Sequence, residues 1–316
     1  MNRRSFVLSR NGCPGLSSSD ILIITFAAIL SMINIAFHER IPNWWLMVLI
    51  NIGASAAIVA IARLSGKSWF LTFIHDWYPP PVVFFSFKEL YYMIKPIHFG
   101  QDYDGLLIAI DQWLFGLNPT EWLMQYAQPW ITEILQIAYT SFYFLFILLG
   151  YELYRRQQKE EFASFMFTCV YGFFLSYIGY FFLPAVGPRF TLHDFSALDQ
   201  ELPGVLLTPW LRWFVNAGGS VPMGVPDEIA LAGTQRDVFP SGHTMMTIVL
   251  MVLASRFKVS NRRVIYVLGI LLIIATVYQR YHYVVDLIAG AVFAALCIVT
   301  APKAQQFITA RLRQSP

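Results

Sequence analysis

The stretch FPSGHT, from Phe239 to Thr244, directly precedes an apolar run, MMTIVLMVLA at 245–254. Ser241 is a favourable N-cap residue, and Gly242 lets backbone N–H groups approach a ligand closely. The first turn of a helix has free N–H groups and the positive end of the helix dipole, which favour an anion such as phosphate. The stretch therefore predicts either an ordinary helix start that contains His243, or a site that holds a phosphate and gives it a proton.

The rest of the chain has the composition of a membrane protein. Its 316 residues are 57% hydrophobic and 13% charged, and mean hydropathy is +0.54. Soluble domains carry roughly 25% charged residues, and a membrane-spanning helix needs roughly 17–25 apolar residues. We predict an all-α, polytopic membrane protein with seven or eight spans. The clear apolar runs are 21–37, 44–62, 130–153, 162–183, 244–256, 264–278 and 284–300.

The basic residues set the predicted topology. The positive-inside rule places their clusters in the cytoplasm. The clusters are Arg3, Arg4 and Arg10; Arg63 and Lys67; Arg155, Arg156 and Lys159; Arg256, Lys258, Arg262 and Arg263; and Lys303, Arg311 and Arg313. His243 and the end of the run 264–278 then lie at the non-cytoplasmic surface. Since Met1–Asp20 has no apolar core, we expect the first apolar segment to remain as a helix.

Two segments between the apolar runs complete this organisation. The topology needs a further crossing within 68–129, either in the aromatic stretch 69–94, which Pro79–Pro81 interrupts, or as a re-entrant segment. Residues 95–128 are predicted to form short interfacial helices. We divide the chain into N-terminal membrane and interfacial helices (1–129) and a helical bundle (130–302), with an outer loop at 184–241. Connections of this length are uncommon unless they are functional.

A second polar stretch, YQRYHYVVDLIAG at 278–290, lies at the outer start of the last apolar run. His282 and Asp286 are four residues apart, so they share one helical face. A carboxylate there can fix the tautomer of the imidazole and stabilise its charged form. Ionisable residues in a membrane segment are costly and suggest function, although this spacing alone also fits a buried ion pair that joins two helices.

Other polar residues are candidates of lower specificity. Arg189, in LPAVGPR at 183–189, can hold phosphate oxygens through its planar guanidinium or contact lipid headgroups. Asp104 and Asp111, seven residues apart, are expected at solvated interfacial positions. His193 in the outer loop is a potential substrate contact. The other histidines, His38, His75 and His98, have no partner at an informative spacing.

Together, these stretches resemble the motifs of the type 2 phosphatidic acid phosphatase superfamily, which is shared with vanadium haloperoxidases. The family's Pro-Ser-Gly-His motif is matched in full at 240–243. Its last motif matches at Tyr278, His282, Tyr283, Asp286, Ala289 and Gly290. The GPR and YxxxHYxxD patterns are most similar to the branch that contains inositol phosphorylceramide synthases, and the resemblance is strongest in the C-terminal half.

Two family positions differ in this chain. The Ser-Arg pair of the last motif falls on Ala275 and Thr276, so Arg280 is the candidate substitute for the missing arginine. The lysine of the first motif falls on Phe182.

The resemblance implies that residues 130–302 form a catalytic bundle of six-helix type. It also implies phosphoryl transfer by two histidines without a metal or cofactor. His282 attacks phosphorus and is oriented by Asp286, while His243 protonates the departing alcohol and then activates the acceptor. The resemblance further implies that Arg189, Arg280, Ser241 and the Gly242 amide stabilise the charge on the phosphate oxygens.

Three functions remain open at this point. The first is hydrolysis of a lipid phosphate or diphosphate. The second is transfer of a phospho-headgroup to a lipid alcohol, and the third is a lipid transporter or flippase with a proton relay. The expected partners are a lipid phosphate substrate and membrane lipids, with no nucleic acid. We expect a multi-pass protein, in the inner membrane if it is bacterial, with its active site on the extracytoplasmic side. The three cysteines, Cys13, Cys169 and Cys297, are expected to be packing residues.

Overall fold

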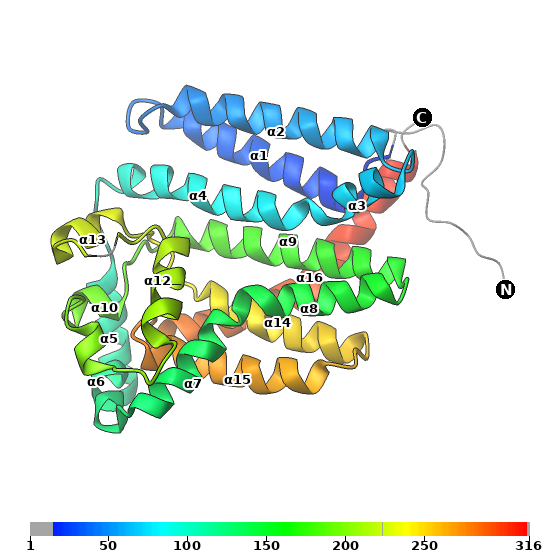
Figure 1. The fold of residues 1–316 in the computed structure, drawn as a ribbon. Coiled ribbons are helices and arrows are strands. Elements are labelled where there is room, and N and C mark those ends of the chain that lie inside the picture. The colour runs from blue at the N-terminus through cyan, green and yellow to red at the C-terminus, as the bar shows by residue number, and fades with distance from the viewer. Residues whose placement is uncertain (1–14, 223, 315–316) are drawn as a thin grey trace. The chain divides into compact units, whose positions relative to one another are not determined.

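The structure is a computed structural model that describes residues 15–222 and 224–314. These residues form helices joined by loops, with no β-strand among them (Figure 1). The prediction of an all-α fold is therefore confirmed. Arg3, Arg4, Arg10 and Cys13 lie outside the described residues.

The chain forms two compact units, each built from separate parts of the sequence. The first contains the chain up to Ile97, Leu153–Phe174 and the chain from Leu296 onward. The second contains His98–Glu152 and Leu175–Ala295. Every predicted site residue lies in the second unit. The two longest helices, α9 (Lys159–Tyr180) and α16 (Val284–Gln314), each contribute to both units.

The first unit begins with four successive helices: α1 (Ser18–Ala36), α2 (Trp44–Leu64), α3 (Trp69–Trp77) and α4 (Pro79–Ile97). The break between α3 and α4 falls at Tyr78, because proline is tolerated in the first turn of a helix but not in its interior. Glu89 on α4 accepts hydrogen bonds of 2.9 Å from the side-chain amides of Asn34 and Asn51. One buried carboxylate thus ties α4 to α1 and α2.

The second unit combines longer bundle helices with short connecting helices. Residues 95–128 form the predicted short helices, and the outer connection contains four more. In chain order the helices are α5 (Asp104–Phe115), α6 (Pro119–Leu123), η1 (Met124–Tyr126), α7 (Pro129–Thr140), α8 (Phe142–Arg155), α10 (Pro188–Thr191), α11 (Leu198–Glu201), α12 (Thr208–Gly218), α13 (Asp227–Gly233), α14 (Gly242–Arg256) and α15 (Arg262–Tyr278).

The bundle of this unit is centred on α15, which packs against α7 and α14. Helices α5 and α12 run crosswise to α14 and α15 in Figure 1. A core of leucine, valine, alanine and tyrosine side chains fills the space around α7, α12 and the end of α15. Its buried members are Leu135, Tyr139, Leu198, Leu202, Val215, Ala275, Tyr278 and Tyr281.

The number of spans differs from the prediction. Four helices, α1, α2, α9 and α16, are long and apolar enough to cross a membrane, and α7 with α8 form a fifth candidate bent by 47°. Helices α14 and α15 occupy predicted spans, but they have only 15 and 17 residues. The prediction of seven or eight spans is therefore not confirmed, because α14 and α15 are short for a membrane crossing.

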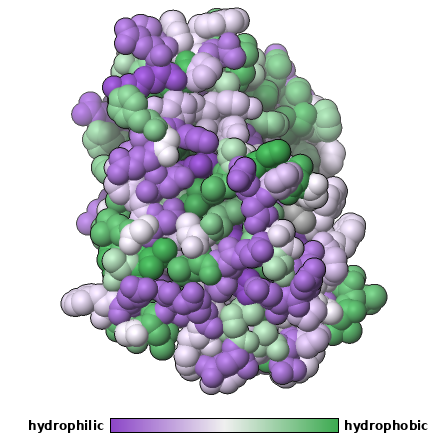
Figure 2. Space-filling view, turned by 90° about the vertical axis from the view of Figure 1, so that its left-hand side faces the viewer, coloured by the Kyte–Doolittle hydropathy of each residue, from purple (hydrophilic) through white to green (hydrophobic). Residues whose placement is uncertain are grey.

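Hydrophilic and hydrophobic residues are interspersed on the face shown in Figure 2. In the outer connection, the α12 side chains Trp210 and Trp213 are 65% and 53% exposed. Tryptophan is enriched at the level of lipid headgroups, so α12 has the composition of an interfacial helix.

Candidate active site

The FPSGHT stretch forms the start of α14, as the capping pattern predicts. The hydroxyl oxygen of Ser241 accepts a hydrogen bond of 3.2 Å from the Thr244 N–H. Gly242 is the first helical residue, and a Cβ atom there would lie 2.4 Å from the hydroxyl oxygen of Tyr180. A larger residue would therefore displace the Tyr180 ring, and His243 follows Gly242 in the first turn of the helix.

His282 lies in a short link between α15, which ends at Tyr278, and α16, which begins at Val284. The backbone N–H groups of Tyr281 and His282 both donate to the carbonyl of Thr276, at 2.9 and 3.0 Å. Arg280 adopts a positive φ of 64°, which turns the chain sharply after α15. This turn fixes the position of His282 between two helix ends.

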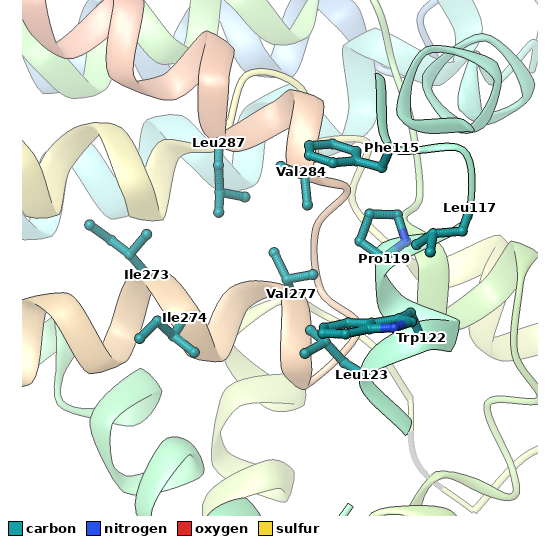
Figure 3. Close-up of a pocket in the computed structure, with 10 residues that line it drawn as sticks. All are labelled: Phe115, Leu117, Pro119, Trp122, Leu123, Ile273, Ile274, Val277, Val284 and Leu287. Atoms are coloured by element: carbon teal, nitrogen blue, oxygen red, sulfur yellow. The ribbon is translucent and has the colours of Figure 1, made fainter. Parts of the chain in front are cut away.

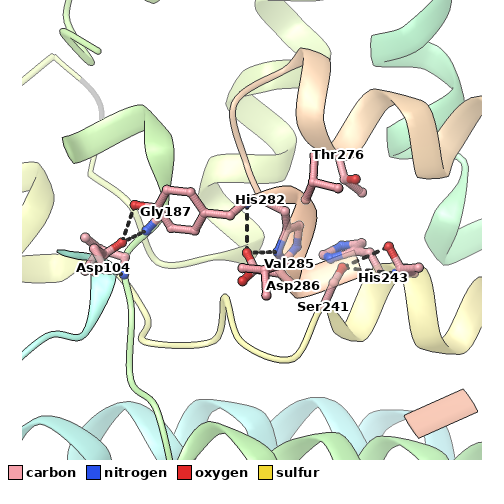
Figure 4. Close-up of polar contacts among 12 residues, drawn as sticks. Asp104, Gly187, Ser241, His243, Thr276, His282, Val285 and Asp286 are labelled. Carbon is pink, nitrogen blue, oxygen red and sulfur yellow. Dashed lines mark hydrogen bonds and ion pairs between the residues drawn. The ribbon is translucent and has the colours of Figure 1, made fainter. Parts of the chain in front are cut away.

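The structure brings the two histidines together. The ring centroids of His243 and His282 are 5.9 Å apart, and their planes are inclined by 61° (Figure 4). They come from opposite ends of a connection that includes all of α14 and α15. The two rings are therefore close enough for one bound phosphate to contact both.

Asp286 lies against His282, at the third position of α16. Its Oδ2 atom accepts a hydrogen bond of 2.8 Å from the Tyr283 N–H, as in one half of a capping box. The same oxygen is 3.4 Å from Nδ1 of His282, a charge contact that is longer than an ordinary hydrogen bond. The carboxylate is fully buried and its other oxygen has no partner. It is thus placed to orient the ring.

The starts of α14 and α16 are joined directly. The Ser241 N–H donates to the carbonyl of Asp286 at 3.0 Å. One turn along α16, a Cβ atom on Gly290 would lie 2.7 Å from the carbonyl oxygen of Ser241. A larger residue at this position would push the helices apart, and with them the two histidines.

Aromatic rings enclose His243. The sequence did not point to these aromatic residues. The ring of Tyr139 stacks on His243 at 4.7 Å, and Phe142 lies 4.5 Å away on α8. Tyr139 also stacks on Tyr281 at 4.3 Å. These side chains come from the bend between α7 and α8, around Ser141. The bend therefore forms one wall of the site.

Arg189 lies beside the same aromatic stack. Its guanidinium carbon is 5.1 Å from the centroid of the Tyr281 ring, and Nη1 donates to the side-chain oxygen of Asn216 at 2.9 Å. Its buried Nε has no hydrogen-bond partner. Arg189 forms no ion pair with a carboxylate in the described part of the chain, so its charge remains available to an anion.

Buried polar atoms without partners gather at this site. They include Nε of Arg189, the hydroxyl oxygen of Tyr281, Nδ1 of His282 and Oδ1 of Asp286. Native structures satisfy most buried polar groups, so such a group of orphans calls for an explanation. A bound polar ligand supplies one. Within the described residues, no group of three or more His, Cys, Asp or Glu side chains is arranged to hold a metal ion.

Comparison with known proteins agrees with this geometry. The sequence profile of the PAP2 superfamily matches residues 106–300, well over half of the chain. The chain belongs to the PAP2 superfamily. It is also 25% identical over 186 residues to a PA-phosphatase related-family protein of Dictyostelium discoideum. This alignment covers 53% of the chain and 31% of that relative. No solved structure matches the chain.

Two residues that the PAP2 resemblance suggested for phosphate binding are engaged elsewhere. The guanidinium of Arg280 pairs with Glu201 at 2.5 Å and contacts the sulfur of Met124. No described contact joins this side chain to either histidine. The Ser241 hydroxyl is fully buried in the α14 cap, whereas the Gly242 amide belongs to the free first turn. Arg189 is thus the arginine that the structure places at the histidine pair.

The positions where this chain departs from the PAP2 motifs are also occupied differently. Thr276 is fully buried, and its carbonyl anchors the His282 link. Phe182, at the position of the family's lysine, is 70% exposed. His193 contacts the Thr120 hydroxyl at 3.1 Å.

The expectation that Asp104 and Asp111 are solvated is wrong. Their side chains lie on the buried face of α5, with residue exposures of 5% and 2%. The two carboxylates accept hydrogen bonds from backbone N–H groups of the segments that carry Arg189 and Asp286. Their i, i+7 spacing was the only signal of a shared role in the sequence.

An apolar cavity of about 440 Å³ adjoins the start of α16 (Figure 3). It lies between α15, α16 and the segment that joins α5 to α6. Val284, two residues after His282, forms part of its wall. The other lining residues are Phe115, Leu117, Pro119, Trp122, Leu123, Ile273, Ile274, Val277 and Leu287.

Proposed function

We propose that the protein is a membrane phosphatase that hydrolyses a phosphate ester or diphosphate of a lipid through a phosphohistidine on His282. The observation that carries the proposal is the 5.9 Å separation of the two imidazole centroids, beside Arg189, whose buried Nε has no hydrogen-bond partner among the described residues. Family membership supports a phosphatase or phosphotransferase, and the name of the Dictyostelium relative suggests phosphatidic acid as the first substrate to test.

The proposed reaction has two balanced steps. In the first, His282 attacks phosphorus, the bond from phosphorus to the lipid oxygen breaks, and His243 donates its proton to that oxygen. In the second, water attacks phosphorus, His243 accepts a proton from the water, and the P–N bond breaks to release phosphate. Arg189 and the free amides of the α14 start stabilise the negative charge on the phosphate oxygens in both steps. No metal or cofactor takes part in these proposed steps.

The apolar cavity supports a lipid substrate. Its wall is built from aliphatic and aromatic side chains and includes Val284, two residues after His282. Ligand sites combine such apolar surface with a few polar groups that fix orientation. A hydrocarbon chain in the cavity would leave the phosphate at the polar end, near the histidines.

Transfer to a lipid alcohol is the second candidate, because the same cavity suits an acceptor chain. The GPR and YxxxHYxxD patterns also support this inositol phosphorylceramide synthase-like alternative. Water and an alcohol would compete for the same phosphohistidine. We propose that the site faces away from the cytoplasm, since α14 and α15 carry their basic clusters at the ends opposite the histidines.

A substrate panel with products resolved by mass separates these functions. Protein in detergent with a chelator is given phosphatidic acid, undecaprenyl diphosphate, or a headgroup-labelled phospholipid with ceramide or diacylglycerol. We expect inorganic phosphate release that persists with the chelator. Movement of the labelled headgroup to the alcohol would identify a transferase. Absence of both reactions, with lipid transport in vesicles, would support the transporter.

The protonation of His282 predicts the pH dependence. Burial lowers the pKa of its ring to about 4, and the positive charge of Arg189 adds to this effect against the opposing charge of Asp237. The ring is therefore neutral and nucleophilic above about pH 5, and it becomes protonated as pH falls through its pKa. We expect the acidic decline of kcat/KM, corrected for the second ionisation of the phosphate at about pH 6, to lie below about pH 5. A separate decline on the alkaline side reports the loss of the proton that His243 must donate. An acidic decline centred at the ordinary histidine value of about 6.5 would contradict the assignment of His282 as a neutral nucleophile.

A further inference from the structure

Helix α5 places two carboxylates on one buried face. Asp104, Leu107 and Asp111 follow each other at helical spacing, and all three are buried. The mechanism above uses neither aspartate. Each nevertheless accepts hydrogen bonds from a segment that carries a site residue.

Asp104 holds the segment before Arg189 and the residue after His282. Its two oxygens accept from the N–H groups of Val186 and Gly187, at 3.0 and 2.8 Å. The Tyr283 hydroxyl donates to Oδ1 of the same carboxylate at 2.7 Å. Gly187 has a φ of 95°, and a Cβ atom there would lie 2.8 Å from the carbonyl oxygen of Tyr281. One carboxylate thus sets the distance between the two segments.

Asp111 holds the start of α16. Its oxygens accept from the N–H groups of Val284 and Val285, at 2.8 Å each. These are the first two residues of the helix, whose N–H groups have no intrahelical partner. Asp286 follows directly, so Asp111 fixes the helix end from which Asp286 meets His282.

We propose that Asp104 and Asp111 are positioning residues, and that α5 works as a clamp that holds the Arg189 segment and the His282–Asp286 segment in register. The inference rests on the proposed function. The clamp requires carboxylates, because each aspartate receives at least two donors and offers two acceptor oxygens. An asparagine keeps the shape but turns one oxygen into an NH₂ group, which would face an N–H donor.

The two aspartates have different expected signatures. Asp111→Asn disturbs the partner of the nucleophile, so kcat is expected to fall about 10- to 100-fold with KM within about twofold of wild type. Asp104→Asn also disturbs the segment that presents Arg189, so KM and the inhibition constant for inorganic phosphate are expected to rise about five- to tenfold as well. A role in folding alone would not change kcat alone in one variant and both kcat and KM in the other.

Glu152→Gln is the matched control. Glu152 accepts from the N–H groups of Ser260 and Asn261, at 2.5 and 3.4 Å, and so caps the start of α15 at the end remote from the histidines. Like Asp111, it accepts hydrogen bonds from two backbone N–H groups at the start of a helix. We expect wild-type kcat and KM for this variant.

The experiment measures kcat, KM and phosphate inhibition for the three variants, together with the rise in melting temperature that inorganic phosphate produces. The expected result is the division described above, with phosphate stabilisation lost in Asp104→Asn but kept in Asp111→Asn and Glu152→Gln. Wild-type kinetics in both aspartate variants, or effects no different from Glu152→Gln, would overturn the clamp.

Two further measurements keep the test decisive. Tyr283→Phe removes one donor to Asp104 and leaves both carboxylates in place. If the aspartate variants fail to fold, a loss of kcat of about three- to tenfold in Tyr283→Phe supports the clamp. Unchanged kcat in this variant overturns it. If wild-type protein binds phosphate without turnover, the proposed function fails, while the loss of phosphate stabilisation in Asp104→Asn still decides the clamp.

Discussion

Replacing His282 by alanine is expected to reduce phosphate release from a lipid phosphate by on the order of 10⁴-fold, because the variant lacks the atom that attacks phosphorus. The phosphate can still bind through Arg189 and the α14 amides, so KM is expected to change little. Initial rates of phosphate release, with protein amounts matched by size-exclusion chromatography, measure the effect.

The control for this variant is His38→Ala. His38 is exposed in the loop between α1 and α2, and its Nδ1 lies 3.0 Å from the carbonyl oxygen of Ile35. We expect wild-type activity from it. Turnover by His282→Ala within about tenfold of wild type would remove His282 as nucleophile, since loss of a nucleophile costs far more than this in other covalent enzymes.

Replacing His243 by glutamine is expected to act differently on different leaving groups. Hydrolysis of a lipid phosphate should fall by about 10³-fold, because an alkoxide leaves poorly without a proton. With p-nitrophenyl phosphate the leaving group departs unprotonated, so the first step should be nearly unaffected. The second step still lacks its base, and the phosphohistidine should accumulate.

A rapid-mixing experiment with p-nitrophenyl phosphate separates the two steps. We expect His243→Gln to release a burst of nitrophenol close to the amount of enzyme, followed by slow turnover. Equal losses on both substrates without a burst would show that His243 serves the structure of the site rather than proton transfer. The stack of His243 with Tyr139 makes melting temperature a necessary companion measurement.

The sequence indicated the histidine pair because local chemistry leaves local patterns. Ser241 and Gly242 mark a helix start, and the spacing of His282 and Asp286 marks a shared face. Both patterns place their residues at helix ends, and the structure brings those ends together. The fold class followed from composition for a similar reason, since apolar runs need no tertiary information.

The parts that sequence could not supply depend on long-range contacts. Asp104 meets Tyr283 across 179 residues, and Tyr139 meets His243 across 104. No spacing rule connects such pairs. Arg280 was suggested because it lies one helical turn beyond the missing arginine position. In the structure its backbone is left-handed, so the helix does not continue through this residue. Its side chain therefore meets Glu201 instead of the histidines.

The span count shows the limit of hydropathy alone. The runs at 244–256 and 264–278 are mostly apolar, and α14 and α15 cover them in full, yet these helices have only 15 and 17 residues. The polar segments 239–243 and 279–283 lie directly beyond these runs, so neither run continues on the histidine side, and both are short for a membrane crossing. Hydropathy alone therefore does not give the number of spans in this part of the chain.

The most direct test is to identify the residue that carries phosphate during turnover. Wild-type protein is mixed with p-nitrophenyl phosphate, quenched within milliseconds at alkaline pH to preserve an acid-labile P–N bond, digested and sequenced by mass spectrometry. The account predicts phosphate on the peptide that contains His282, at the histidine itself, and its absence in His282→Ala. Phosphate on any other residue, or full turnover with no phosphorylated peptide, would contradict it.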